Sequence, residues 1–405
     1  MSHRDDTRPG VDLGSLQLPA GHAWHRLTAL GGALAVVGLG GSLALGLRDP
    51  TQFYFSWLVA FTFFLSIALG ALFFVLTHYV TKASWSVVIR RLAEHVMSAL
   101  PLFVVLFIPV FLGLERLYHW TDPEALAHDS LLRGKQAYLN PGFFLVRAAI
   151  YLASWSGMAL WFASRSARQD RTGDLPTTLR MIRLSAPALL VFAVTVTFAA
   201  FDWIMSLDPH WYSTIFGVYY FSGCLVGFFA VLALFAAAAR RAGLLGGAVT
   251  VEHFHDVGKL LFAFTVFWAY IAFSQFFLIW YGNIPEETAF YLHRSHGSWS
   301  AVTAMLAWGH FGVPFLFLMS RNIKRRTAFL AAGAVWMLVM HLIDLHWLIM
   351  PVHHGEGLHP TLLDFTTLVG IGGAFLAFVG QRLRRGALVP VRDPRLAESL
   401  GFENA

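Results

Sequence analysis

Long apolar runs alternate with short polar loops along the whole chain. A helix that crosses a bilayer needs about 20 apolar residues, and ten runs meet this requirement. The pattern therefore predicts an all-α polytopic membrane protein with ten transmembrane helices. The predicted spans are residues 27–47, 53–79, 92–114, 142–164, 181–206, 211–239, 257–281, 298–320, 327–350 and 362–380.

The loops between these runs differ in charge from one side to the other. Of the 29 lysine and arginine residues, 23 fall on alternate loops and on the two chain ends. The positive-inside rule places these segments in the cytoplasm, and residues 1–21 lack the apolar core of a signal peptide. We therefore expect cytoplasmic tails at residues 1–26 and 381–405 and a membrane domain at residues 27–380.

Composition supports this class and narrows the chemistry. Hydrophobic residues make up 57% of the chain and charged residues 13%, against about 25% charged in soluble domains. The net charge of +6 lies in the loops, where it sets topology, so we expect a lipid membrane and no nucleic acid as partner. The single cysteine, Cys224, excludes an internal disulfide and a thiolate-ligated cluster.

The polar segment FDWIMSLDPHW, residues 201–211, lies between two apolar runs. A charge inside an apolar run costs roughly 2.5–3.5 kcal/mol at mid-bilayer, so Asp202 needs a partner or a role. Residues 341–354 end another run with a similar order of Asp, Trp, Ile-Met, Pro and His. This echo predicts two four-helix bundles, residues 53–206 and 211–350, plus two peripheral helices; a chance match is the alternative.

Two aspartates and two basic residues inside the spans are candidates for proton transfer. Asp202 and Asp344 each lie about six residues before the end of a predicted span. His341 precedes Asp344 by three residues on one helix face, so the carboxylate can hold its N–H and the two can form a proton relay. Arg147 either pairs with Asp202 or extends to the outer headgroups. The alternative for the aspartates and His341 is to satisfy polar groups of neighbouring helices.

His310 lies near the middle of the span 298–320, beside Gly309 and Gly312. These glycines leave room for another helix or a flat ligand, so haem comes into consideration. Bis-histidine haem ligation needs histidines paired at a common depth, and no such pair is evident. We therefore expect no metal bound by this chain, and His310 joins the proton-path candidates.

Titratable residues gather near the face opposite the predicted cytoplasmic side. Imidazoles titrate near neutral pH, so this group can release or collect protons; docking of a partner protein is the alternative. The candidates singled out there are Asp208, His210, His346 and His353.

Three segments resemble a known family. The run DWIMSLDPHWYSTIFG within residues 201–223 resembles the ActF-type integral membrane subunits of alternative complex III, a bacterial quinol:cytochrome c oxidoreductase. Residues 297–326 and 344–354 support the likeness. That family is in turn similar to the NrfD/polysulfide-reductase membrane subunits, which have two four-helix bundles and two peripheral helices.

The resemblance implies a place in a respiratory complex of the bacterial inner membrane. The implied partners are a periplasmic multihaem cytochrome c, an iron–sulfur subunit, a homologous ten-span subunit that holds the quinol pocket, and small membrane subunits. Haem c and iron–sulfur clusters would belong to those partners, and quinone is the possible cofactor of this chain. The motif residues are Asp202, Asp208, His210, Asp344 and His346, without individual roles.

The leading hypothesis is a membrane subunit without its own redox metal that supports quinol oxidation and conducts protons. The expected path uses Asp202, His310, His341 and Asp344, with discharge near the outer face. The second hypothesis is a structural scaffold without a quinone or proton site. A stand-alone ion transporter is less well supported, because no pair of interrupted short helices is evident.

Overall fold

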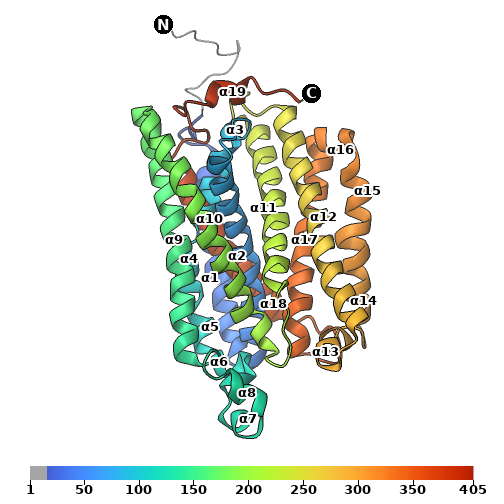
Figure 1. Cartoon of the computed structure of the whole chain (residues 1–405). Coiled ribbons are helices and arrows are strands. Elements are labelled where there is room, and N and C mark those ends of the chain that lie inside the picture. Colours follow the sequence, from blue (N-terminus) through green and yellow to red (C-terminus); the bar gives the residue numbers. More distant parts are fainter. Residues whose placement is uncertain (1–15, 405) are drawn as a thin grey trace, which may run out of the picture.

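The computed structural model describes residues 16–404, and ten helical segments in this range are long and apolar enough to cross a membrane. They stand side by side in an elongated bundle (Figure 1). The described residues form no β-strand, and one isolated bridge pairs Gln17 with Ala387. The long helices are α1 (Leu27–Gly46), α2 (Pro50–Val80), α3 (Val87–Met97), α9 (Pro141–Thr172), α10 (Leu175–Trp203), α11 (Phe216–Arg241), α12 (Val251–Gly282), α17 (Thr327–Ile349) and α18 (Leu362–Leu383).

Short helices complete or connect these segments. The third segment continues from α3 through α4 and α5, and the eighth consists of α14, a π-helical turn labelled η5, and α15. The short elements are α4 (Leu102–Leu106), α5 (Ile108–Leu112), α6 (Leu114–Leu117), α7 (Pro123–His128), α8 (Ser130–Lys135), α13 (Pro285–His293), α14 (Trp299–Met305), η5 (Leu306–Gly312), α15 (Val313–Met319), α16 (Arg321–Arg325) and α19 (Leu396–Leu400).

The ten predicted spans are confirmed as helical segments, with corrections at their ends. The third segment begins at Val87 rather than at residue 92. The sequence pattern left the charged residues before residue 92 outside the span, whereas the structure buries them within the helical segment. Arg90 is completely buried and bonds both Glu94 and Asp393. The sixth begins at Phe216 rather than residue 211.

Helix α2 lies at the centre of the fold. Its sequence contains no aspartate, glutamate, lysine or arginine, and 89% of its most apolar stretch is buried. A helix that is apolar on every face is suited to a position with neighbours all round. It packs against α3 and α10, against α11 and α17, and against α18. The two predicted four-helix groups are therefore joined along α2, while the internal repeat stays a prediction.

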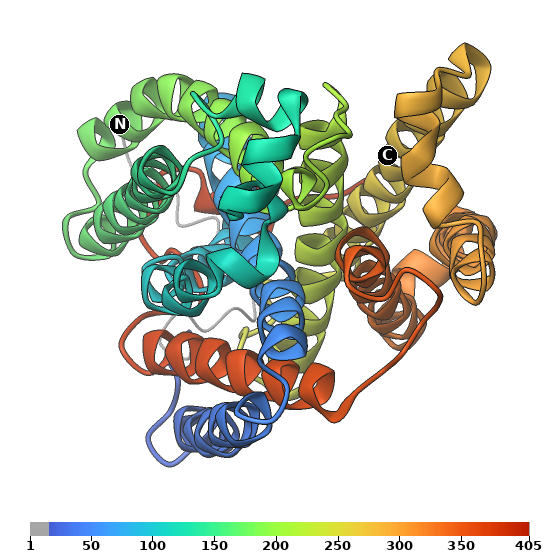
Figure 2. The ribbon, with the colours of Figure 1, turned by 90° about the horizontal axis from the view of Figure 1, so that it is seen from below.

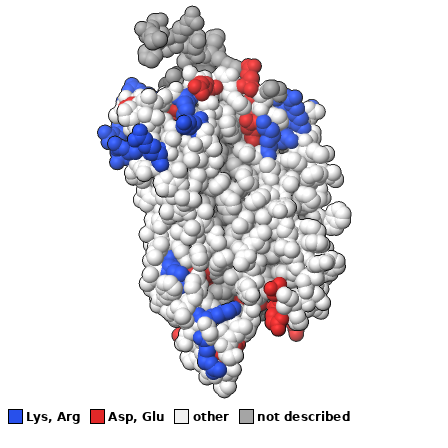
Figure 3. All heavy atoms as spheres, viewed as in Figure 1, with Lys and Arg blue, Asp and Glu red and all other residues white. Residues whose placement is uncertain are grey.

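Both ends of the described chain lie at the same end of the bundle. The backbone N–H of Leu388 donates to the carbonyl of Leu16, and α19 covers this end (Figure 1). Lysine and arginine side chains gather here, with fewer at the opposite end (Figure 3). This distribution agrees with the positive-inside pattern, and the cytoplasmic orientation remains a prediction. Residues 1–15 of the predicted N-terminal tail lie outside the described residues.

Helices α1 and α18 form a closely packed pair at one edge of the bundle (Figure 2). Glycines make the close approach possible: a Cβ atom added to Gly38 would collide with the backbone of Gly370, and one added to Gly373 would collide with the backbone of Ala35. Small residues at helix interfaces are typical of membrane proteins, where association depends on packing. The predicted peripheral helices are thus held to each other as well as to α2.

Replacement of Gly38 by alanine is expected to destabilise this pair by about 1–3 kcal/mol, because the added methyl group collides with backbone atoms. The measurement is the thermal unfolding midpoint of the protein in detergent micelles. Gly40→Ala is the matched control, since no atom outside its own helix among residues 16–404 lies within 4 Å of a Cβ added there. Equal midpoints for the two variants would contradict the prediction.

Candidate functional site

Two aspartates are buried inside the helical bundle. Asp202 on α10 is completely inaccessible, and Asp344 on α17 is 1% exposed. Asp202 lies one residue before the end of its helix and Asp344 five residues before the end of α17. Their positions relative to the helix ends therefore differ, although the sequence pattern predicts equal offsets. Their hydrogen-bond partners differ still more.

Asp202 is held by a cation. Arg147 on α9 donates from Nε and Nη2 to the two carboxylate oxygens, at 2.8 and 2.9 Å. The Tyr151 hydroxyl, one helical turn further along α9, donates to the same carboxylate at 2.8 Å. The predicted Arg147–Asp202 pair is thus confirmed, and the arginine does not extend to the headgroups. Arg147 also donates to the carbonyl of Tyr138 and lies 3.8 Å from its ring.

This arrangement holds the Asp202 carboxylate in a fixed position. A bidentate guanidinium–carboxylate pair is a strong charge-assisted contact, and a third donor satisfies a further lone pair. Tyr138, in the loop before α9, stays protonated because burial and the Asp202 charge raise its pKa. Asp202 and Arg147 accordingly form a structural ion pair that links α9 to α10. A carboxylate in such a pair is poorly suited to carry a proton.

Asp344 is held by neutral groups. The Tyr219 hydroxyl on α11 donates to one carboxylate oxygen at 2.6 Å, and the Trp268 indole on α12 donates to the other at 3.1 Å. No lysine or arginine between residues 16 and 404 forms an ion pair with it. The carboxylate can therefore accept a proton without breaking an ion pair. This is the chemical difference between the two aspartates.

His341, one turn before Asp344, is oriented by α2 rather than by the aspartate. The Ser66 hydroxyl donates to the carbonyl of Phe63 and lies 2.8 Å from Nε2 of His341. The hydroxyl can accept from a protonated Nε2 or donate to an unprotonated one, and in either case it holds the ring in place. The Nδ1 atom has no hydrogen-bond partner among residues 16–404. The predicted His341–Asp344 hydrogen bond is therefore wrong.

His310 lies in the π-helical turn η5 and is completely buried. Neither ring nitrogen has a hydrogen-bond partner in the described part of the chain, and the ring stacks on Trp268 with 3.7 Å between centroids. Single π-helical turns often occur at functional sites. Gly309 allows the close approach of Met340 on α17, as predicted, whereas Gly312 faces Trp308 of its own segment.

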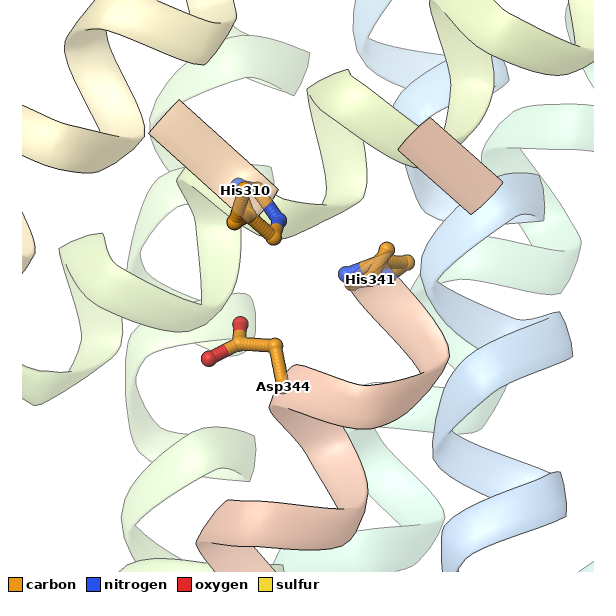
Figure 4. A group of neighbouring side chains, drawn as sticks. All are labelled: His310, His341 and Asp344. Carbon is orange, nitrogen blue, oxygen red and sulfur yellow. The ribbon is translucent and has the colours of Figure 1, made fainter. Parts of the chain in front are cut away.

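These residues form one buried cluster. Each of His310, His341 and Asp344 offers a ligand atom, and the three atoms lie within 4.8 Å of one another. Figure 4 shows the two imidazoles and the carboxylate facing the same space between α17 and η5. Such a set of lone pairs can hold a proton or a metal ion. We refer to these three residues as the His–His–Asp cluster.

The remaining predicted site residues lie outside this cluster. His210 is exposed and bonds Asp129, and Asp208 accepts a hydrogen bond from the backbone of His210. His346 is half-buried, and the His353 ring stacks on Phe55 at 4.9 Å.

Burial lowers the pKa of His353 and of its neighbour His354 below the ordinary value. Both imidazoles are therefore neutral at pH 7. The predicted outer group of titratable residues is thus dispersed over several elements.

An apolar groove adjoins the His–His–Asp cluster. Its volume is about 540 Å³, and Tyr219 and Trp268, the two donors to Asp344, contribute to its wall. Tyr270 and Phe273 of α12 also line it and are exposed, so the groove lies at the surface of the helical bundle. An apolar ligand in this groove would lie beside the two side chains that hold the carboxylate.

Several residues of the site are absent from the sequence-based candidates. Tyr219, Trp268 and Ser66 position the cluster, yet tyrosine, tryptophan and serine in apolar spans are also typical of packing or of interfacial belts. Tyr151 had a usable signal, because it follows Arg147 by four residues and therefore shares its helix face.

Arg294 is a further residue that the sequence analysis did not single out. It is 3% exposed and donates to the carbonyls of Trp347 and Leu348 at the end of α17. Burial lowers its pKa to about 9, so it stays charged at pH 7. A cation at a helix C-terminus is favourable, and Arg294 thereby fixes the end of the helix that carries His341 and Asp344.

Neither a scan against protein-family models nor a search of curated proteins gave a match for this chain. The structure therefore defines the class, an all-α multi-pass membrane protein, and function has to be argued from the site.

Replacement of Arg147 by alanine is expected to destabilise the protein by about 3–5 kcal/mol, because it leaves the Asp202 charge buried without a partner. The double variant Arg147→Met/Asp202→Leu should be more stable than Arg147→Ala, since it removes both charges. Unfolding of the detergent-solubilised protein measures both effects. Arg116→Ala, at an exposed position, controls for loss of a positive charge. A double variant no more stable than the single one would contradict this account.

Proposed function

We propose that this protein is a membrane subunit of a bacterial quinol:cytochrome c oxidoreductase of the alternative complex III type and conducts protons through the His–His–Asp cluster. The observation that carries the proposal is the set of contacts to Asp344, a buried carboxylate held by neutral donors beside two imidazoles. Intramembrane ionisable residues of this kind commonly mark proton paths. The motif resemblance supports the choice of complex.

Proton transfer requires groups that can gain and lose a proton while their surroundings stay in place. Asp344 meets this condition because Tyr219 and Trp268 can hold either form of the carboxyl group through its oxygens. His341 is hydrogen-bonded to Ser66 through Nε2, and its Nδ1 has no partner among the described residues. It can therefore take up a proton on one nitrogen and release one from the other. His310 lies within reach of both.

The apolar groove beside Tyr219 and Trp268 supports a place for the quinone. Ligand sites of this kind are mostly apolar with a few polar groups, and the Tyr219 hydroxyl connects the groove wall to Asp344. We propose that a quinone at this surface would exchange protons with Asp344 by way of Tyr219. The electron carriers would be the haem c and iron–sulfur clusters of partner subunits.

A scaffold function is the second candidate, and the Arg147–Asp202 pair favours it. This pair is fully satisfied and joins two long helices, which is what a structural role requires. The two hypotheses differ in their expectations for the two aspartates. A proton-conducting subunit needs the acid at Asp344, whereas a scaffold needs only its hydrogen bonds.

Asp344→Asn is expected to lower quinol oxidation and the coupled proton release by about 10-fold or more, because an amide cannot relay a proton, while the complex stays assembled. Asp202→Asn should instead reduce the amount of assembled complex. The measurements are turnover and proton release per assembled complex, with subunit ratios as the measure of assembly. Asp344→Glu should restore part of the turnover.

Glu115→Gln, at an exposed position, is the control for loss of a carboxylate. Unchanged turnover and proton release in Asp344→Asn would overturn proton conduction through the cluster. Loss of assembly with normal activity in the remaining complex, for both aspartate variants, would favour the scaffold.

A further inference from the structure

His310 is an anomaly among the buried polar residues of this protein. Its ring is completely inaccessible, and neither nitrogen has a partner within residues 16–404. A buried polar group without a hydrogen bond is destabilising, and native structures contain few of them. Nδ1 of His341, in the same cluster, also lacks a partner among the described residues. Two imidazoles with nitrogens unpartnered in the described chain lie beside one carboxylate, and this arrangement suggests that the space between them binds a cation.

We propose that the His–His–Asp cluster binds one divalent transition-metal ion of the Zn²⁺ class. Two imidazole nitrogens and a carboxylate oxygen are ligands that Zn²⁺ prefers, and three protein ligands with one open position are a common arrangement for it. This inference does not rest on the proposed proton conduction, because metal binding requires only the lone pairs and their geometry.

The spacing of the ligand atoms is suitable for such an ion. At bond lengths of about 2.0–2.1 Å, the ligand atoms of a tetrahedral Zn²⁺ site are about 3.3–3.4 Å apart. The three candidate atoms lie within 4.8 Å of one another. The widest pair therefore has to close by no more than about 1.5 Å relative to that tetrahedral separation.

Further contacts orient two of the ligands. Ser66 bonds Nε2 of His341 and leaves Nδ1 without a partner among the described residues, and Tyr219 and Trp268 fix the carboxylate of Asp344. Hydrogen bonds from neighbouring residues to the ligands are usual at metal sites and raise the affinity of the site for the metal. Gly223 of α11 provides space for the imidazole, since a Cβ there would lie 2.8 Å from Cε1 of His341.

The bound ion would use the same lone pairs that a proton would use. Metal and proton therefore compete, and the affinity for Zn²⁺ should fall as the pH is lowered. The adjoining groove is apolar, which is a poor route for a hydrated cation. We expect loading to be most complete when the metal is present while the helices assemble.

The test is the metal content of the full-length chain, expressed with added Zn²⁺, purified in detergent and freed of loose metal on a desalting column. A second sample receives Zn²⁺ after purification. We expect about one Zn²⁺ per chain in the wild type. In His310→Gln and in His341→Gln the occupancy should be lower than in the wild type by about 10-fold or more. X-ray absorption at the zinc edge should show two imidazole ligands and additional oxygen.

His359→Gln, at an exposed position outside the cluster, is the matched control and should retain the metal. Circular dichroism and the thermal midpoint establish that each variant is folded, and Asp344→Glu, which keeps a carboxylate, should retain at least part of the occupancy. Absence of Zn²⁺ from both wild-type samples would overturn the proposal. So would occupancy that is unchanged in His310→Gln and His341→Gln.

This test and the test of proton conduction have separate readouts, metal content and turnover. A chain that binds Zn²⁺ but whose Asp344→Asn variant shows normal turnover would retain the metal site and lose the proton path. A chain that binds no Zn²⁺ but whose Asp344→Asn variant loses turnover would retain the proton path and lose the metal site.

Discussion

The organisation of this protein depends on the satisfaction of carboxylates that are buried among apolar helices. A buried charge is costly unless it is paired and hydrogen-bonded. Asp202 meets this requirement with Arg147 and Tyr151, so that a full opposite charge and three donated hydrogen bonds surround it. Asp344 has two neutral donors and, within residues 16–404, no cation. The same residue type, buried on two helices of one bundle, has therefore acquired two different electrostatic environments.

The apolar framework makes the second environment possible. Helix α2 can occupy the centre because it is apolar on every face, and it delivers Ser66 to His341. Glycines of α11 leave space for that imidazole, and Arg294 fixes the end of α17 beyond it. The cluster thus depends on several separate helices, each of which is held mainly by packing.

Sequence periodicity was sufficient to predict the ten spans, because the thickness of the bilayer sets the length of every apolar run. The Arg147–Asp202 pair could also be predicted from the sequence, since consecutive spans are neighbours and a charge inside an apolar span needs a partner. The His–His–Asp cluster could not be predicted in this way. His341 contacts Ser66 across 275 positions of sequence, and no local pattern encodes which distant helix faces meet. Tyr219 and Trp268 look like ordinary packing residues until the carboxylate between them is seen.

The π-helical turn of η5 has no evident sequence signal, yet it places His310 against Trp268 with both nitrogens unpaired in the described part of the chain. In electrostatic terms the cluster lacks, among the described residues, the positive charge that Arg147 supplies to Asp202. A proton and a divalent cation are two ways to supply that charge, and both would bind at the same lone pairs. This difference from the Asp202 site is what makes the cluster suited to exchange, because a fixed arginine at this position would exclude reversible binding of either one.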